Sequence, residues 1–466
     1  MKNKASNHIR PFGIRDKIGY LFGDFGNDFT FLLSSSFLLK FYTDVMGIEA
    51  AVVGIVMMIA RFADGFTDVA MGRICDKSRV TANGKFKPWI RRMCGPVAIS
   101  SFLIYQSSLA DMSLRFKIVY LFITYIMWGS VFYTSINIPY GSMASAISED
   151  PGDRQSLSTY RTMGGMLAGA IVTAVVPIVA YDKINGKEIL NGSKFTVVSG
   201  AFSLLAVICY LLCFSLTTER VKVQTNADVH RSNGIGKMIS NAVRNRALIS
   251  IIAASVVMLL AQLTMQQMAN YVFPNFYRNA RAQSISVLIM TVGIALSAVV
   301  AKPLAEKYGK AEISVVSNLA AGIVSGGLYF VRPQSVWVYL GLQAVQWFGL
   351  GIFSMVSWAL ITDVIDYSEI KNGIREDGAV YALYSFARKL GQAASSGITG
   401  ALLSIIGYSQ STAFDERVVN GIFDISTVVP AVGFILLGFI LWLWYPLRKK
   451  QVEENVRLLK EKRKRK

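Results

Sequence analysis

The sequence predicts an all-α polytopic membrane protein, and three observations lead to this fold class. Hydrophobic residues make up 53% of the 466 residues. Charged residues make up only 17%, whereas soluble domains carry about 25%. Apolar runs recur from end to end with short polar breaks, and a spanning helix needs roughly 20 apolar residues, so there is room for about twelve spans. The pattern excludes a soluble enzyme, a disordered protein and a disulfide scaffold.

The predicted spans follow the apolar runs in order. They are 18–42, 50–74, 93–110, 117–146, 160–181, 195–217, 247–276, 283–305, 312–331, 336–367, 378–407 and 425–446. The longest interior polar stretch divides them six and six. The predicted domains are an N-terminal six-helix bundle (1–217), a central cytoplasmic loop (218–246), a C-terminal six-helix bundle (247–446) and a basic cytoplasmic tail (447–466). The tail is expected to be a short surface helix or to lack regular structure.

Charge fixes the predicted orientation. The net charge is +19. With the N-terminus inside, the cytoplasmic segments hold about 33 Lys and Arg and the opposite loops about nine, as the positive-inside rule requires. Both termini are therefore expected in the cytoplasm, and the positive charge indicates contact with anionic lipid, with no role for nucleic acid. The two histidines, His8 and His230, both lie in polar segments, so no histidine metal or haem site and no cofactor is expected.

A loop after the second span of each half suggests an internal repeat. It reads GKFKPW at 84–89 in the first half and KPLAEKYGK at 302–310 in the second. Such a repeat is expected of two six-helix halves that rock about a central site. The alternative is that any cytoplasmic loop is basic and contains glycine.

Three charged residues in the second span are the strongest functional signal. Arg61, Asp64 and Asp68 fall within about 60° of each other on one helix face. Three mid-membrane charges cost about 9 kcal/mol, so they must face a hydrated or paired interior and mark a functional site. The alternative is a structural Arg61–Asp64 ion pair.

Other spans carry charges as well. Asp24 and Asp28 lie one turn apart in the first span, beside two glycines that permit close approach of another helix. The eleventh span contributes Arg388 and Lys389, of which one points to the centre. Asp363 and Asp366 lie near the cytoplasmic end of the tenth span, where a gate or an interface salt bridge is favoured over a binding site. The listed acids of spans one and two outnumber Arg61, Arg388 and Lys389 by one, and a bound Na⁺ or a proton would neutralise the difference.

Aromatic and amide groups accompany these charges, and this mixture suits a sugar. The residues are Tyr20, Phe29, Trp128, Tyr133, Asn137, Tyr140, Gln346, Trp347, Trp358, Tyr381 and Tyr384. Singly, each aromatic is as well explained by packing or by an interfacial belt.

Together these motifs resemble the glycoside–pentoside–hexuronide:cation symporters, a branch of the major facilitator superfamily. The motifs are YLFGD at 20–24 with Asn27 and Asp28, FYTD at 41–44, ARFAD at 60–64 with Asp68, GKFKPW at 84–89, NIPYGS at 137–142, Asp153 and Arg154 with Arg161, and DVIDY at 363–367. The resemblance covers essentially the whole chain. It implies the major facilitator fold with two six-helix bundles, and alternating access coupled to Na⁺, Li⁺ or H⁺.

The resemblance also assigns candidate residues. Cation-binding positions of melibiose permease correspond to Asp64 and Asp68, with the hydroxyl of Thr134 nearby, and the two aspartates form a metal site only if Na⁺ is the coupling ion. The sugar-binding positions of melibiose permease correspond to Asp28 and Arg161, and its span-eleven lysine to Lys389. Together with the charged, amide and aromatic groups noted above, the substrate-binding candidates are Asp24, Asp28, Tyr133, Asn137, Arg161, Tyr384 and Lys389. The candidates for gate or structural pairs are Arg61, Arg388, Asp363 and Asp366.

Three positions depart from melibiose permease. Asn137 replaces an aspartate, Gly141 a tryptophan and Thr67 an asparagine. The lost carboxylate weakens a Na⁺ assignment, and the first two changes favour a glucuronide or xyloside over melibiose. Arg388 could pair with an anionic sugar or belong to a cytoplasmic gate.

The sequence therefore predicts a secondary active transporter, a monomer in a bacterial-type cytoplasmic membrane, that imports a glycoside, pentoside or hexuronide with a cation. The first alternative is a lipid-type carrier of the same branch, for example for a lysophospholipid. A membrane enzyme is disfavoured because both histidines lie outside the spans.

Overall fold

The computed structural model describes residues 10–221, 245–372 and 377–464, and its helices follow the predicted spans. In the first half they are α1 (Ile14–Asp44), α2 (Ala50–Lys77), α3 (Lys87–Ile104), α4 (Leu114–Ile126), η2 (Met127–Tyr133), α5 (Thr134–Ile147), α6 (Pro151–Val179) and α7 (Gly192–Leu216). A short η1 (Ser107–Leu109) precedes α4. Each predicted span of this half overlaps one helix or one helical run, so their helical character is confirmed.

The second half continues the series. It contains α9 (Arg246–Tyr271), η3 (Val272–Phe276), α10 (Arg281–Tyr308), α11 (Lys310–Val331), α12 (Val336–Asn372), α13 (Asp377–Ile405), α14 (Glu416–Phe439), η4 (Ile440–Trp444) and α15 (Lys449–Lys464). The tail is thus a helix over its described part. Of the predicted central loop, residues 222–244 lie outside the described residues.

Nine helices or helical runs in the described part of the chain are long and apolar enough to cross a membrane. The predicted spans outside that set fall on α1, α3 and α13. Charged residues lower the hydropathy of two of these helices. Helix α1 contains Asp24 and Asp28, and α13 contains Arg388 and Lys389. The charged residues that mark α1 and α13 as candidate functional helices are therefore also the reason for their low hydropathy.

A β-hairpin between α6 and α7 was not predicted. Strands β1 (Tyr181–Ile184) and β2 (Lys187–Leu190) form a two-stranded sheet. Asn185 and Gly186 join them with φ of 50° and 75°. Two central residues at positive φ are typical of a type I′ turn, for which Asn-Gly is the favoured pair. The Asn-Gly pair was visible in the sequence, but the strands on either side of it are only four residues long.

Contacts divide the chain into two compact units. The first comprises 1–41, 63–181 and 190–229, and the second comprises 42–62, 182–189 and 230–466. The ends of α1 and α2 that face their connecting loop thus belong to the second unit. The predicted domain boundaries follow sequence order and stay a prediction.

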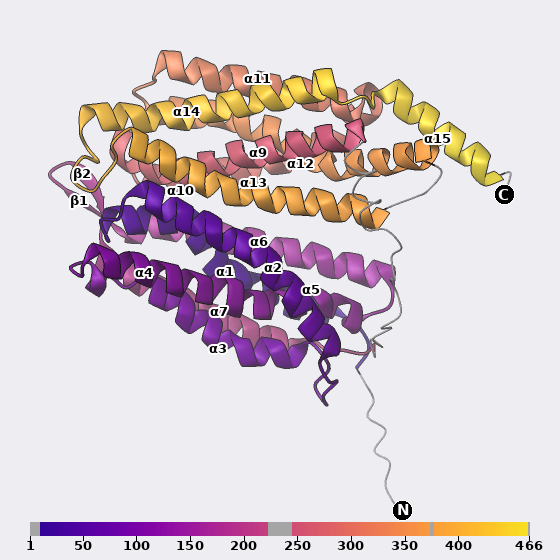
Figure 1. Ribbon diagram of the computed structural model, residues 1–466, viewed down its shortest axis with the longest axis horizontal. Coiled ribbons are helices and arrows are strands. Elements are labelled where there is room, and N and C mark those ends of the chain that lie inside the picture. Colours follow the sequence, from indigo (N-terminus) through magenta and orange to yellow (C-terminus); the bar gives the residue numbers. More distant parts are fainter. Residues whose placement is uncertain (1–9, 222–244, 373–376, 465–466) are drawn as a thin grey trace, which may run out of the picture. The chain divides into compact units, whose positions relative to one another are not determined.

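Within the first unit, α3 packs against α7 and α5, and glycines bring α1 close to its neighbours (Figure 1). A Cβ at Gly23 would collide with the ring of Tyr140, and one at Gly26 would lie 3.1 Å from the Ala206 carbonyl oxygen. The predicted role of these two glycines in close approach is confirmed.

Within the second unit, α11 packs against α14 and α12, while α9 packs against α13 and α14 (Figure 1). Buried Trp347, Phe353 and Phe434 belong to its core. A Cβ at Gly400 of α13 would collide with the carbonyl oxygen of Ala50. The small residues of α13 thus permit close packing.

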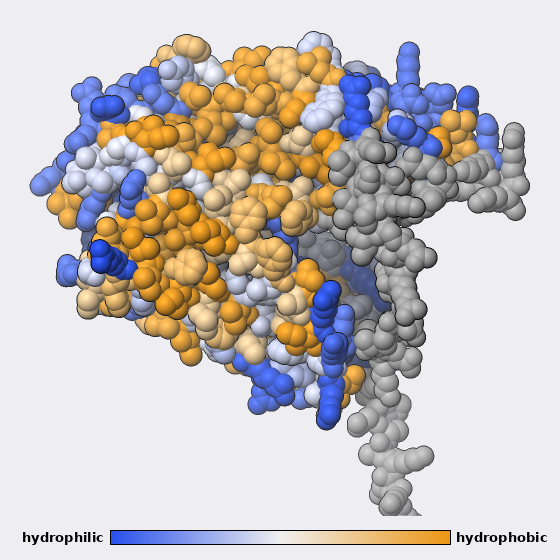
Figure 2. Space-filling model, in the orientation of Figure 1, coloured by the Kyte–Doolittle hydropathy of each residue, from blue (hydrophilic) through white to orange (hydrophobic). Residues whose placement is uncertain are grey.

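Large apolar side chains cover the outward flanks of the helices. Phe66 is 78% exposed, Val299 74% and Phe330 82%. Figure 2 shows hydrophobic residues over the helix flanks and hydrophilic ones over α15 and the opposite helix ends. This distribution is typical of helices that contact lipid along their length.

At the end predicted to be cytoplasmic, each unit has a set of hydrogen bonds, here called the clamp, between the segment after its sixth helix and the junction of its second and third helices. In the first, the Glu219 carboxylate after α7 accepts the backbone N–H groups of Lys85 at 2.7 Å, Phe86 at 2.9 Å and Lys87 at 2.7 Å. These groups follow Gly84, whose φ of 104° suits glycine alone.

In the second unit, the clamp is formed by Lys449 at the start of α15. Its backbone N–H donates to Glu312 at 3.1 Å, and its Nζ donates to the carbonyls of Glu306 at 2.8 Å and Lys307 at 2.9 Å. Here Gly309 has φ of 105°. In each unit, the segment after the sixth helix therefore hydrogen-bonds to residues at the junction of the second and third helices, which supports the predicted repeat.

Candidate functional site

An ion pair between α6 and α1 joins two predicted substrate-binding residues. Nε of Arg161 donates to Oδ1 of Asp24 at 3.0 Å, with side chains 38% and 14% exposed. The guanidinium lies 5.2 Å from the centroid of the Tyr140 ring. The helices approach closely because Gly164 leaves room for the carbonyl of Leu21. Arg161 is thereby oriented by a carboxylate and an aromatic face.

Asp28 lies beside the same pair. A Cβ built at Gly165 would lie 2.5 Å from Oδ2 of Asp28 and 2.9 Å from Oδ2 of Asp24. Both carboxylates thus converge on one glycine of α6. The structure places Asp24, Asp28 and Arg161 in one polar cluster, with only the two helices α1 and α6 needed to form it.

Asn137 is held from α1 by an amide that was not predicted as a site residue. Nδ2 of Asn27 donates to Oδ1 of Asn137 at 3.3 Å, and the Tyr210 hydroxyl donates to Oδ1 of Asn27 at 2.9 Å. Asn27 is buried, and Tyr210 is buried with it. Asn27 precedes Asp28 on α1, so this chain links Asn137 to the carboxylate cluster. Tyr210 carries no sequence signal, because nothing in its apolar span distinguishes it from a packing tyrosine.

The two candidate cation-binding carboxylates each accept a hydroxyl from the η2–α5 segment. Oγ of Ser130 donates to Oδ1 of Asp64 at 2.6 Å, and Oγ1 of Thr134 donates to Oδ1 of Asp68 at 3.0 Å. Asp64 and Asp68 are half-buried on the side of α2 that is opposite exposed Phe66. The proximity of Thr134 to Asp68 agrees with the expected placement, and Ser130 was missed because a lone serine in an apolar run is unremarkable.

Helix α5 connects the two groups of residues. Thr134 and Asn137 are three residues apart, and residues at this spacing lie on one helix face. Thr134 contacts Asp68, and Asn137 contacts Asn27. Tyr133 precedes them, half-buried, with its ring 5.5 Å from that of Phe31. The candidate cation and sugar residues of the first unit are therefore neighbours through one helix.

The second unit holds the remaining substrate candidates on α13. Tyr384 is fully buried, and its hydroxyl accepts a hydrogen bond from Ser255 at 2.9 Å. The Arg388 guanidinium lies 5.7 Å from the Tyr384 ring and 5.9 Å from the Trp358 ring. Lys389 is exposed. Tyr384 and Arg388 are thus brought together, with Tyr384 packed in the helix interface.

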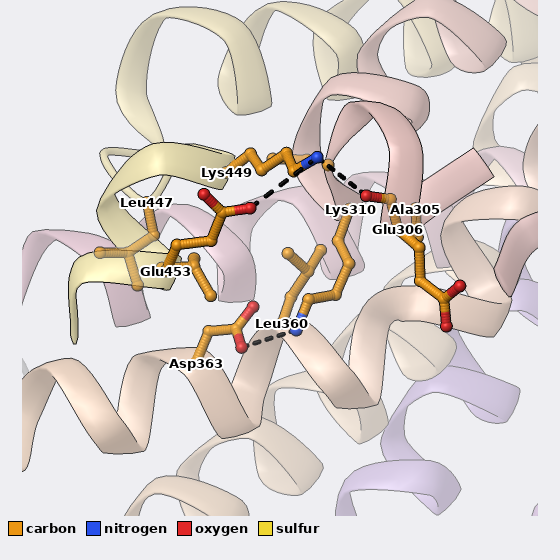
Figure 3. Close-up of a pocket in the computed structure, with 11 residues that line it drawn as sticks. Ala305, Glu306, Lys310, Leu360, Asp363, Leu447, Lys449 and Glu453 are labelled. Carbon is orange, nitrogen blue, oxygen red and sulfur yellow. Dashed lines mark hydrogen bonds and ion pairs between the residues drawn. The ribbon is translucent and has the colours of Figure 1, made fainter. Parts of the chain in front are cut away.

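Asp363 pairs within its own unit. Nζ of Lys310 donates to its Oδ1 at 2.6 Å (Figure 3). The pair lines a cavity of about 160 Å³ between α12 and the start of α15, which Lys449 and Glu453 also line. Asp366 is half-buried near the end of α12. A salt bridge is present as expected, and the gate role stays a prediction.

The charge balance predicted from the sequence is wrong. It left out Arg161, which the structure pairs with Asp24. When Arg161 is counted, acids and bases balance, so the sum gives no argument for a bound cation. Arg61, the remaining gate candidate, is half-buried on α2. Among the described residues, no group of three histidine, cysteine or acidic side chains is arranged to hold a metal ion.

Comparisons with known proteins agree with this architecture. The model of a family described as MFS/sugar transport protein matches residues 19–449. The glucuronide carrier protein homolog of Escherichia coli (strain K12) is 29% identical over 95% of this chain and 94% of its own. The isoprimeverose transporter of Lactiplantibacillus pentosus is 30% identical over 93% of this chain and 89% of its own.

A solved structure shares the fold. The nucleoside transporter NupG superposes with a TM-score of 0.64 at 13% identity, covering 93% of this chain and 99% of that one. Together these matches confirm the resemblance and the major facilitator fold that it implies.

Proposed function

We propose that this chain, which belongs to the MFS/sugar transport protein family, carries a glycoside, pentoside or hexuronide across the membrane by symport with a cation. Two relatives support the substrate class by name, one a glucuronide carrier homolog and the other an isoprimeverose transporter. Neither is named for a lipid, so the relatives do not favour the lipid-type alternative.

The observation that carries the proposal is the shared helix α5. The Thr134 hydroxyl donates to Asp68 of the carboxylate pair. Asn137 accepts a hydrogen bond from Asn27, which precedes Asp28 of the polar cluster on α1. Carboxylates with hydroxyls suit a hard cation. Carboxylate, amide and guanidinium groups can bind the hydroxyls of a sugar. A carrier needs its two ligands to affect one another, and one helix here contacts both sets.

In the proposed cycle, the cation binds at Asp64 and Asp68 and orders α5. The sugar then binds through Asp28, Asn137 and Arg161. Only the empty or doubly loaded carrier reorients, which couples the two fluxes. Tyr384 and Lys389 of the second unit are also proposed as substrate-binding residues, and the exposed Lys389 suits an anionic sugar. Arg388 is proposed either to pair with such a sugar or to belong to a cytoplasmic gate.

The test uses the purified protein in proteoliposomes, with isoprimeverose and methyl β-D-glucuronide as probes under imposed Na⁺ or pH gradients. Asp64→Cys and Asp68→Cys are expected to abolish gradient-driven accumulation while membrane insertion is retained. Asp111→Cys, at an exposed loop position, is the matched control. Retained accumulation in both mutants would refute the cation assignment. Transport of a lysophospholipid together with an absence of sugar uptake would favour the lipid-type carrier instead.

From the positive-inside rule we propose that both termini lie in the cytoplasm. We also propose that the protein is a monomer in a bacterial cytoplasmic membrane. Labelling of single cysteines placed in the β1–β2 turn and in α15 tests the orientation. A turn that reacts only from outside and an α15 that reacts only from inside are expected, and the reverse pattern would overturn the orientation.

A further inference from the structure

The segment between α4 and α5 has an unusual backbone. Over Met127–Tyr133 the helix is π-helical, and the N–H of Thr134 donates to the carbonyls of Gly129 and Val131. π-helical turns inside α-helices are rare and occur frequently at functional sites. The nearest proline in the same run, Pro139, follows the segment and does not account for it.

This segment faces Asp64 and Asp68 with two hydroxyls in matched register. Ser130 and Thr134 are four residues apart, as are the two aspartates, so each hydroxyl reaches one carboxylate. Both hydroxyl-bearing residues are buried, Ser130 at 4% exposure and Thr134 at 3%. Gly129 lies against Asp64 as well, because a Cβ there would be 3.5 Å from its Oδ1. Buried donors on two successive carboxylates form a built polar site.

Two nearby polar groups, the Thr67 hydroxyl and the Asn137 amide oxygen, have partners other than the two carboxylates. The hydroxyl of Thr67 donates to the backbone carbonyl of Asp64 at 3.2 Å. The amide oxygen of Asn137 accepts from Asn27. The Ser130 hydroxyl, in contrast to that of Thr67, donates to a carboxylate oxygen of the pair.

We propose that Ser130 is a positioning residue of the cation site, holding the Asp64 carboxylate as Thr134 holds that of Asp68, and that its hydroxyl favours a hard metal cation as the coupling ion. The inference rests on the proposed function. A hydroxyl donor stabilises the ionised carboxylate that a metal cation requires, and Ser Oγ is itself an oxygen of the kind Na⁺ and Li⁺ bind.

The experiment compares three substitutions with the parent. Ser130→Ala removes the hydroxyl, and Ser130→Thr restores it. Ser135→Ala removes a nearby hydroxyl that donates only to its own helix, to the Val131 carbonyl at 2.6 Å. The readouts are the Na⁺ concentration for half-maximal isoprimeverose uptake and, without sugar, the Na⁺ concentration that half-saturates thermal stabilisation of the purified protein.

We expect Ser130→Ala to raise both Na⁺ concentrations about 10-fold or more, since a hydrogen bond to a charged group is lost. Its maximal uptake at saturating Na⁺ should stay within about two-fold of the parent, because a positioning role acts on cation affinity. Ser130→Thr should lie near the parent, and Ser135→Ala should match it. Unchanged Na⁺ dependence in Ser130→Ala, or equal losses in Ser130→Ala and Ser135→Ala, would overturn the inference.

The two proposals fail differently. If the parent itself takes up sugar with no response to Na⁺, Li⁺ or pH, the proposed symport is wrong. If the parent responds to pH alone, symport stands and the preference for a metal cation is wrong. If Ser130→Ala does not fold, Ser130→Thr and a Ser130→Cys variant carry the comparison. Na⁺ dependence identical to the parent in Ser130→Cys, whose thiol is a weak donor, then counts against the role of the hydroxyl.

Discussion

Replacing Glu219 by alanine removes the carboxylate that closes the first unit. Its two oxygens accept three backbone N–H groups from Lys85, Phe86 and Lys87. Backbone N–H groups at the start of a helix have no partner within that helix, and their partial positive charge favours an anion. Glu219 therefore acts as a cap for α3 supplied from 132 residues further along the chain than Lys87.

The expected loss is about 2–3 kcal/mol of unfolding free energy. A hydrogen bond to a charged group contributes about 1.5–3 kcal/mol and the helix terminus about 0.3–1 kcal/mol. The three bonds share one half-buried carboxylate, and water replaces part of them in the variant, so the contributions do not add. For a unit of roughly 150–250 residues, this loss lowers the melting temperature by about 4–12 °C. Glu219→Gln should lie between the parent and Glu219→Ala.

The assay heats the detergent-purified protein and measures the fraction that remains monodisperse by size-exclusion chromatography. Glu149→Ala is the control, because Glu149 is an exposed glutamate of the same unit. It should melt with the parent. A melting temperature for Glu219→Ala within about 1 °C of the parent, or an equal drop in the control, would refute the capping argument.

Two further substitutions test the first unit. Gly165→Ala places a Cβ 2.5 Å from Oδ2 of Asp28 and 2.9 Å from Oδ2 of Asp24, so both carboxylates must move. The sugar concentration for half-maximal uptake should therefore rise about 10-fold, while the amount of protein inserted in the membrane stays unchanged. Normal sugar affinity would exclude this cluster from the binding site. Tyr210→Phe removes the hydroxyl that donates to Asn27 at 2.9 Å. The variant should lose about 1–2 kcal/mol of unfolding free energy, which is measured as a lower melting temperature. An unchanged melting temperature would show that this hydrogen bond does not stabilise the protein.

The sequence named the charged residues of the candidate site but could not pair them. Asp24 and Arg161 are 137 residues apart, and hydropathy periodicity says which face of a helix is polar without saying which helix it meets. That Thr134 lies near Asp68 was predicted from the family resemblance, because hydropathy periodicity alone does not show which helices are neighbours. The charge sum made from the sequence also omitted Arg161, which lies at the start of the predicted span 160–181 and was not counted among the central charges.

Uncharged partners were beyond the sequence for a different reason. Ser130 and Tyr210 are ordinary residues of apolar spans, and only their contacts distinguish them. The π-helical segment could not be predicted from the sequence either, because one extra residue in a helical turn leaves composition and hydropathy unchanged. The apolar run at 117–146 therefore predicts one continuous span, whereas the structure divides it into α4, η2 and α5.

The division of that span gives a physical reason for the coupling that we propose between the cation and the sugar. A helix is stiff over one turn, so a displacement of Thr134 toward a cation at Asp68 also moves Asn137, three residues on. The π-helical turn before Thr134 interrupts the regular hydrogen-bond ladder. Movement of α5 is therefore transmitted less fully to α4 than to Asn137. Typical coupling free energies between two sites are about 1–3 kcal/mol, which is comparable to the about 1.5–3 kcal/mol of one hydrogen bond to a charged group. The contact of Thr134 with Asp68 is therefore large enough to supply a coupling of that size.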